Sequence, residues 1–202
     1  LGISGDKIKI IITQLVRLVE DGKEVKMSKR RGEFITLEEL VKEVGLDATR
    51  FFFLMHSPDT HMDFDMKLAK EKSMKNPVYY VQYAYVRCNS ILEKAQSTKP
   101  KTQIKHKTQT IKTLNTDEER VLIKKLIQFP EIVEDTAGDF QVIRLTRYAL
   151  ELSKIFHNFY EKHQVITENN ELQNARLTLV NSTQVVLHNI LALLGISKPE
   201  KL

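Results

Sequence analysis

The sequence predicts a mainly α-helical protein in which a short strand-and-hairpin segment precedes a helical bundle. A β-branched run at residues 8–12 and the turn signal Asp21-Gly22 predict the strands. Two capping boxes, and apolar residues at helical spacing from residue 77 onward, predict the helices.

Composition narrows the class of protein. The 202 residues are 42% hydrophobic and 28% charged, which is typical of a soluble globular chain, and the net charge of +5 suits a polyanionic partner. Cys88 is the single cysteine, which excludes an internal disulfide and a cysteine-based zinc site and favours a reducing, cytoplasmic setting. No apolar run reaches about 18 residues, so no membrane-spanning helix is predicted. The start at Leu1-Gly2-Ile3 indicates a piece of a longer protein.

The first predicted elements are a strand near residues 7–12 and a hairpin whose second arm runs through Gly22 to Met27. Thr36 as N-cap and Glu39 three residues later form the first capping box. The helix that follows ends at Gly45 and carries its apolar stripe on Leu37, Leu40, Val41 and Val44.

A second helix is predicted from Asp47, as its N-cap, to Met55. The three consecutive phenylalanines at 51–53 cannot share one helical face, so this helix should be buried on most sides. Residues 61–65 are predicted to form a polar loop.

A short helix over residues 66–73, capped by Asp65, comes next. Its lysines face either solvent or phosphate: Lys67, Lys70, Lys72 and Lys75. Asn76 as cap and Pro77 at the first helical position then begin a helix of about 20 residues that ends near Ala95.

Two stripes of side chains follow that long helix. The apolar stripe predicts core positions at Val78, Val81, Tyr85, Cys88 and Leu92. The other stripe presents aromatic rings and a guanidinium at Tyr80, Tyr83 and Arg87, beside Asn89 and Ser90. Such a surface suits stacking on unpaired bases. By pattern alone, however, these tyrosines are more typical of core edges with satisfied hydroxyl groups.

The rest of the chain reads as a connector and further helices. Residues 97–113 hold five lysines and no acid, which predicts an extended connector. The predicted helices then follow a second capping box at Thr116 and Glu119, with a short helix from Pro130 to near Gly138, a long one over 140–161 and a last one from Glu171 to Gly195.

The segment 25–32 concentrates basic side chains on a connection between a strand-like run and a helix start. A short positive loop suits phosphate, although solvated basic turns are common. The order Lys26-Met27-Ser28-Lys29 makes this cluster far less ordinary.

Lys26-Met27-Ser28-Lys29 resembles the KMSKS loop of class I aminoacyl-tRNA synthetases. Further segments resemble the bacterial-type arginyl-tRNA synthetase family in particular: Val16-Arg17-Leu18, Asp21-Gly22, Lys26 to Leu37, Gly45 to Phe52, Asp63-Phe64-Asp65, Asn76 to Ala84, Phe159-Tyr160 and Leu194-Gly195-Ile196. The resemblance covers essentially the whole chain, as roughly the C-terminal third of such an enzyme.

The resemblance implies three parts. Residues 1–55 would be the end of a Rossmann-type catalytic domain with its KMSK loop. Residues 56–75 would be a connecting region that contacts the tRNA stem, and residues 76–202 an α-helical anticodon-binding domain of the DALR type. That name comes from an Asp-Ala-Leu-Arg motif, which residues 47–50 match with Thr49 in place of leucine.

The resemblance also implies roles in catalysis. In class I enzymes an amino-acid carboxylate attacks the α-phosphate of ATP, and a loop lysine stabilises the charge on the departing pyrophosphate. Here Lys29 would do this, with Lys26 assisting and Ser28 holding the loop closed, so these three are the expected catalytic residues. The implied ATP-binding residues are Lys26, Met27, Ser28 and Lys29, and the implied phosphate or tRNA contacts on the loop are Arg30 and Arg31.

For tRNA, the family's anticodon contacts fall on Tyr80, Tyr83 and Arg87, which overturns the core-edge interpretation of that stripe. Asn76 and Leu202 complete the expected tRNA contacts. The family's tail usually ends in Arg-Met or similar, so the contact by Leu202 stays open.

The implied protein is a fragment of a cytoplasmic, monomeric arginine–tRNA ligase whose partners are tRNA-Arg, arginine and ATP with Mg²⁺ as substrate. No membrane, no metal site and no tightly bound cofactor are expected. The family's HIGH-type motif and arginine pocket are not found in these residues, so we expect the piece to be inactive alone but to bind tRNA weakly. Two other hypotheses stay open: a free-standing RNA-binding module, and a structural helical domain with a basic surface.

Overall fold

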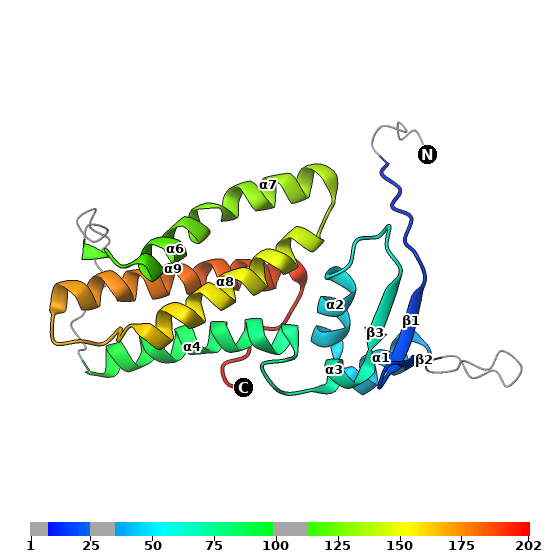
Figure 1. Cartoon of the computed structure of the whole chain (residues 1–202), viewed down its shortest axis with the longest axis horizontal. Coiled ribbons are helices and arrows are strands. Elements are labelled where there is room, and N and C mark those ends of the chain that lie inside the picture. The colour runs from blue at the N-terminus through cyan, green and yellow to red at the C-terminus, as the bar shows by residue number, and fades with distance from the viewer. Residues whose placement is uncertain (1–7, 25–34, 99–112) are drawn as a thin grey trace, which may run out of the picture.

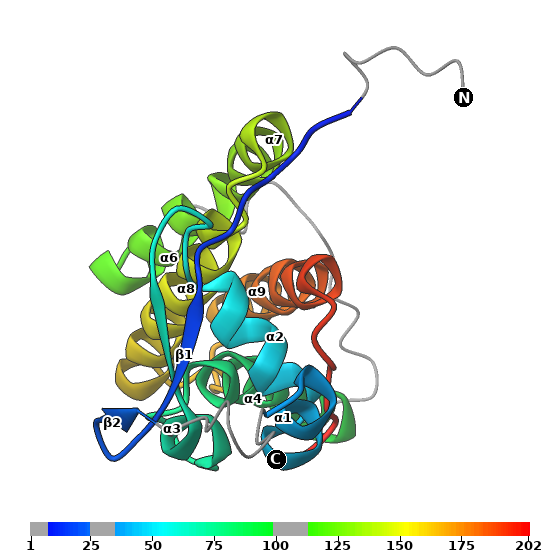
Figure 2. The same ribbon diagram turned by 90° about the vertical axis from the view of Figure 1, so that its right-hand side faces the viewer.

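The computed structural model describes residues 8–24, 35–98 and 113–202. A small sheet with three short helices lies beside a bundle of longer helices (Figures 1 and 2). This confirms the predicted mainly α-helical fold with a small N-terminal sheet. The elements are β1 Val16–Glu20, β2 Lys23–Glu24, α1 Leu37–Val44, α2 Leu46–Leu54, β3 Met62–Asp65, α3 Met66–Lys70, α4 Pro77–Thr98, α6 Asp117–Ile127, α7 Phe129–Asp139, α8 Ile143–Lys162 and α9 Asn170–Leu194.

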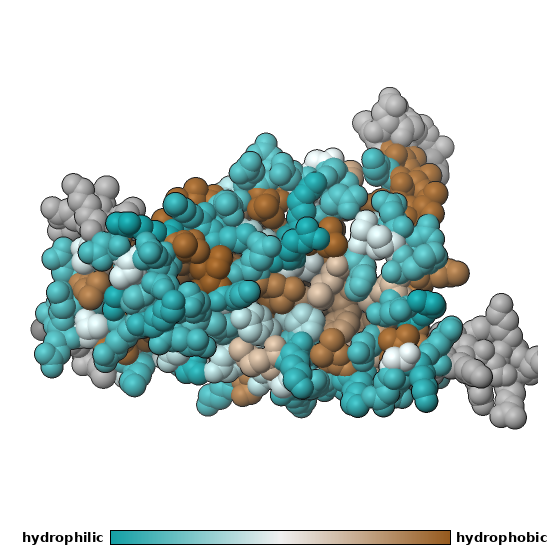
Figure 3. Space-filling model, in the orientation of Figure 1, coloured by the Kyte–Doolittle hydropathy of each residue, from teal (hydrophilic) through white to brown (hydrophobic). Residues whose placement is uncertain are grey.

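The predicted hairpin is confirmed as far as Glu24, beyond which its second arm lies outside the described residues, but the strand predicted before it is wrong. β1 and β2 pair antiparallel around Asp21-Gly22, where φ is 49° and 73°. The described part of the segment 7–12 holds no strand, and Ile10 is 79% exposed. β-branched side chains stabilise a strand through a neighbouring strand, and no described residue pairs with this segment. Its isoleucines form a hydrophobic strip at the upper right of Figure 3.

The predicted polar loop at residues 61–65 is also wrong, because most of it is β3. β3 runs parallel to β1, which gives the sheet order β2-β1-β3. Its side chains alternate between the two faces: Met62 and Phe64 are buried, whereas Asp63 accepts from Arg17 Nε at 2.7 Å on the exposed face.

Helix α2 lies between the sheet and the bundle, and it contacts α4, α8 and α9. Phe51 and Phe52 are buried, and the Phe52 ring centroid lies 5.3 Å from that of Phe64, so the predicted burial on most sides is confirmed. The N-cap of α2 is Gly45, so the prediction that Asp47 caps this helix is wrong.

Asp47 instead holds the C-terminal tail. Its carboxylate accepts hydrogen bonds from the Ser197 amide at 2.9 Å, from the Ser197 hydroxyl and from Gln82 Nε2 at 2.8 Å. Arg50 Nη1 donates to the Gly195 carbonyl at 2.8 Å. These five residues, named here the C-terminal latch, join the start of α2 to α4 and to the end of α9.

Both predicted capping boxes are confirmed. The Glu39 carboxylate accepts from the Thr36 amide at 2.7 Å, and the Glu119 carboxylate accepts from the Thr116 amide at 3.0 Å. Other helix ends shifted by a few residues. Thus α3 ends at Lys70, short of the predicted residue 73, and α4 continues past the predicted end near residue 95 to residue 98.

The predicted start of the helix over residues 140–161 is wrong by three residues. Phe140 is the left-handed C-cap of α7, with φ 64°, and α8 begins at Ile143. Gly195 adopts the left-handed C-cap of α9, with φ 64°, so the predicted end of the last helix is confirmed.

Helix α9 differs from one expectation. Among the described helices it alone is long and apolar enough to cross a membrane by length and composition, a test that the core helix of a soluble protein also passes. Uncharged polar residues such as Asn181, Ser182 and Thr183 interrupt its apolar run without excluding the helix by this test. In the structure α9 packs on α4, α8 and α6.

The bundle contains a buried ion pair between α6 and α9. Glu119 is fully buried, and Arg176 Nε donates to its Oε1 at 2.8 Å. Arg176 Nη1 also donates to the Gln164 carbonyl at 2.8 Å. Burial raises the pKa of Glu119, but hydrogen bonds from Thr116 and Arg176 outweigh burial and leave that pKa below its ordinary value.

Candidate nucleic-acid interface

A groove lies between α4 and α8 on the surface of the bundle. Tyr80, Tyr83 and Arg87 are spaced at i, i+3 and i+7, so α4 presents them on one face. The predicted core stripe of α4 is buried at Val78, Val81, Tyr85 and Cys88, and this burial fixes which face α4 turns outward. The groove, named here the tyrosine groove, is lined by Ser73, Met74, Tyr79, Tyr80, Tyr83, Arg87, His157, Tyr160 and Glu161.

Arg87 lies between two tyrosine rings. Its guanidinium carbon is 5.3 Å from the centroid of Tyr83 and 5.0 Å from that of Tyr160. It also donates a hydrogen bond to the Tyr83 hydroxyl, which is the main cause that raises the pKa of Arg87. The groove therefore presents a cation held against aromatic faces.

His157 on α8 forms the floor of the groove. Its imidazole packs edge-on against Tyr80, with centroids 4.9 Å apart, and lies 5.6 Å from the ring of Tyr83. Burial lowers the pKa of His157, so the imidazole is neutral near pH 7. Burial, followed by the nearby Glu161 carboxylate, raises the pKa of Tyr80, which keeps that hydroxyl protonated.

The predicted stripe on α4 thus faces residues of α8 that the sequence analysis did not identify as site residues. His157 and Tyr160 are spaced at i, i+3 on α8, and this spacing of two ring side chains was the available signal. Their position opposite α4 depends on how the two helices pack. Half-buried tyrosine rings with a guanidinium between them can stack on an unpaired base.

Asn76 and Leu202 occupy different environments. The Asn76 side chain is buried: its Nδ2 donates to the carbonyls of Ala69 and Glu71, and its Oδ1 accepts from the Val78 amide. These bonds hold the turn before α4. Leu202 is 50% exposed at the end of the tail that the C-terminal latch holds.

The residues predicted for ATP lie outside the described residues. They are Lys26, Met27, Ser28 and Lys29. Arg30, Arg31 and residues 99–112 of the predicted connector also lie outside the described residues. The lysines on and after α3 are exposed: Lys67 pairs with Asp21 at 2.6 Å and Lys70 with Glu43 at 2.5 Å, which leaves both predicted alternatives, solvent and phosphate, open.

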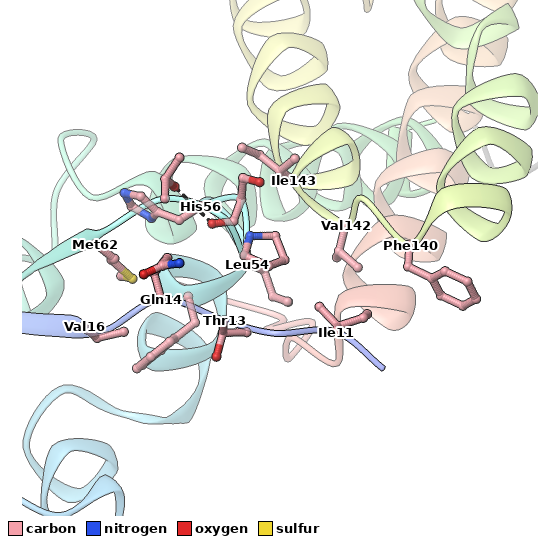
Figure 4. Close-up of a pocket in the computed structure, with 14 residues that line it drawn as sticks. Ile11, Thr13, Gln14, Val16, Leu54, His56, Met62, Phe140, Val142 and Ile143 are labelled. Atoms are coloured by element: carbon pink, nitrogen blue, oxygen red, sulfur yellow. Dashed lines mark hydrogen bonds between the residues drawn. The ribbon is translucent and has the colours of Figure 1, made fainter. Parts of the chain in front are cut away.

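A second pocket, shown in Figure 4, lies between the N-terminal segment, the end of α2 and the link from α7 to α8. Its labelled walls are mostly apolar and include Ile11, Val16, Leu54, Met62, Val142 and Ile143. None of the predicted site residues lines it. Of these two sites, the tyrosine groove is the one that contains residues predicted to contact tRNA, together with further polar and aromatic side chains.

Known proteins resemble the chain over its whole length. It is 46% identical, over 203 aligned residues, to the arginine–tRNA ligase of Desulforamulus reducens and spans 36% of that protein. A crystal structure assigned to an arginyl-tRNA synthetase from Campylobacter jejuni matches 100% of the chain and 42% of its own length, at a TM-score of 0.80 and 26% identity. The Thermus thermophilus arginyl-tRNA synthetase matches 92% of the chain and 34% of its own length, at a TM-score of 0.69 and 26% identity.

The family model of the DALR anticodon binding domain matches residues 81–202. This range contains Tyr83, Arg87 and the α8 side of the groove. It does not contain residues 47–50, so it gives no support to the assignment of the name-giving motif there. Because the model covers more than half of the chain, and because the groove lies within its range apart from the residues before Val81, the chain belongs to the DALR anticodon binding domain family.

Proposed function

We propose that this chain is the part of an arginine–tRNA ligase that binds the anticodon of tRNA-Arg and carries the loop that acts on ATP. The observation that supports this most is the tyrosine groove, because it combines stacking rings and a guanidinium on a domain of an anticodon-binding family. Similarity to arginine–tRNA ligases along the entire chain supports the choice of amino acid. The assignment to parts also belongs to this proposal: residues 1–55 catalytic, 56–75 connecting and 76–202 anticodon-binding.

At the anticodon, an unpaired base stacks on the rings of Tyr80 and Tyr83 while Arg87 supplies a positive charge and donors at the rim. Tyr160 holds Arg87 from the other side. Asn76 acts indirectly, because its bonds to the preceding turn fix where α4 begins. Leu202 adds an apolar contact from the tail.

At the ATP site, the resemblance assigns Lys29, with Lys26 and Ser28, to the phosphates of ATP bound with Mg²⁺. The arginine carboxylate attacks the α-phosphate, and pyrophosphate leaves with its negative charge next to the loop cations. These cations lower the barrier because the charge grows as the bond to pyrophosphate breaks. Arg30 and Arg31 contact phosphate or tRNA beside the loop.

Binding of labelled tRNA-Arg to the 202-residue chain, followed by fluorescence anisotropy at low salt, tests the anticodon assignment. Tyr83→Ala should weaken binding roughly 5- to 150-fold, the range found for loss of one base–aromatic stack. Arg147→Ala is the matched control for Arg87→Ala. Arg147 is an exposed arginine on α8, the helix that forms one wall of the groove, but it does not line the groove. Equal effects of the two arginine variants, or wild-type binding without salt dependence, would refute the assignment.

The activity assignment has a separate test. We expect the 202-residue chain alone to show no arginine-dependent pyrophosphate exchange and no charging of tRNA, because it spans only 36% of the related ligase. Turnover by this chain would contradict that expectation.

RNA binding that is lost in Tyr83→Ala and Arg87→Ala without loss of helicity excludes a purely structural domain. A parent protein that cannot activate arginine would favour a free-standing RNA-binding module. We also propose that the parent is cytoplasmic and monomeric.

A further inference from the structure

The floor of the tyrosine groove contains an unpaired polar atom. Among the buried side chains that the structure describes, Nε2 of His157 is the atom without a hydrogen-bond partner. The His157 residue is 8% exposed, and the rings of Tyr80 and Tyr83 cover it. An unpaired buried polar atom is unfavourable, so in a native structure a water, an ion or a ligand is expected to supply the missing partner.

The surroundings leave His157 neutral. Burial is the main cause that lowers its pKa, and the charge of Arg87 acts in the same direction. A backbone interaction with Tyr80 and the carboxylate of Glu161 act in the opposite direction but do not outweigh burial. A neutral imidazole offers one donor and one acceptor, so it can distinguish hydrogen-bonding edges.

The side chains that cover Nε2 can move without the helices. The two rings that cover it, Tyr80 and Tyr83, are half-buried, and the hydrogen bond that holds Tyr83 joins it to Arg87, which is half-buried too. Rotation of their side chains opens the floor while the backbones of α4 and α8 stay packed. Such rotations are fast compared with movement of helices.

We propose that His157 is a specificity-determining residue of the tyrosine groove, whose Nε2 hydrogen-bonds to the edge of the unpaired RNA base that stacks on Tyr80 and Tyr83. This inference rests on the proposed RNA-binding function of the groove. A base with a complementary group satisfies Nε2. A base without it leaves Nε2 unpaired in the complex and binds more weakly.

The test compares binding of a tRNA-Arg anticodon stem-loop with binding of stem-loops in which one loop base at a time is replaced. The wild-type chain, His157→Phe and His157→Gln are each measured against this series by fluorescence anisotropy. Phe keeps a ring on the floor but has no polar atom, whereas Gln keeps a donor and an acceptor. His188→Phe is the matched control, because His188 lies at Tyr85 and Lys198 and does not line the groove.

We expect His157→Phe to reduce discrimination at one loop position by about five- to tenfold, the worth of one hydrogen bond, and to leave the other positions unchanged. His157→Gln should retain part of the discrimination, and His188→Phe all of it. A loss of affinity by the same factor for every stem-loop would mean that His157 is only structural, and would overturn the proposal.

A measurement on the unaltered chain covers the case in which a variant does not fold. The side-chain ¹⁵N signal of His157 Nε2 should shift when the original stem-loop binds, and should not shift with the stem-loop replaced at the discriminated position. Binding without any shift overturns the inference alone. If the wild-type chain binds none of the stem-loops, the proposed function fails as well, so the two failures are distinguishable.

Discussion

Removal of the positive charge from the buried pair between α6 and α9 should destabilise the protein strongly. In Arg176→Met the side chain keeps most of its length, but Glu119 stays fully buried without its cation. Breaking a buried pair in this way costs about 3–5 kcal/mol. For a chain of this size each kcal/mol lowers the midpoint of thermal unfolding by roughly 2–4 °C, so we expect a decrease of about 6–20 °C at pH 7.

The pH dependence of the same variant identifies the cause. In the wild-type chain the lowered pKa of Glu119 contributes stability above pH 4.5, which is lost as pH falls through the folded-state pKa. Without Arg176, burial should raise this pKa, so the variant loses stability as pH rises through the new value. The two proteins should therefore differ least at acid pH and most above neutrality, measured by far-UV circular dichroism in urea.

Two further variants complete this test. Arg176→Met combined with Glu119→Gln should recover most of the loss, since the double variant has no buried charge. Arg144→Met is the matched control: its pair with Asp139 lies at the surface, and its loss should have little effect. A double variant no more stable than Arg176→Met, or a penalty that is the same at every pH, would refute the reasoning.

Three more outcomes are expected. Gly195→Ala should lower the unfolding midpoint, because a Cβ there would stand 2.1 Å from Arg50 Nη1 at a φ of +64°, and thermal unfolding should show a smaller effect in an Arg50→Ala background. Lys162→Met should raise the pKa of Glu118, which the hydrogen bond from Lys162 helps to hold at about 2, and a carboxyl ¹³C titration measures this change. In the wild type Glu118 adds stability above pH 4.5, and this stability is lost as pH falls towards 2. The variant should show a smaller contribution over the same pH range. Cys88 is fully buried and burial raises its thiol pKa well above the ordinary value, so alkylation followed by mass spectrometry should label it only after unfolding, and rapid labelling of the native chain would contradict its position.

Local signals predicted much of the fold. The capping boxes at Thr36 and Thr116 were correct because each involves residues only three positions apart. The apolar stripe of α4 was correct at four positions for the same reason: helical spacing alone sets which side chains share a face.

Features that depend on distant partners were missed or wrong. Residues 8–12 have strong strand propensity but no partner strand among the described residues, whereas residues 62–65 form β3 because β1 lies beside them. Asp47 has the residue type of an N-cap, yet it bonds to Ser197, 150 positions away. The i, i+3 spacing of His157 and Tyr160 does not by itself reveal a site, since the position of His157 under the groove follows from how α4 and α8 pack.

The C-terminal latch has a consequence for the order in which the chain is made. Its bond from Arg50 spans 145 positions and its bond to Asp47 spans 150. At a synthesis rate of roughly 5–20 residues per second, the start of α2 leaves the ribosome on the order of 10 seconds before Ser197 does. During that interval Asp47 lacks Ser197 and Arg50 lacks Gly195. The sheet and the bundle therefore become joined at this point only after residues 195–197 have been made.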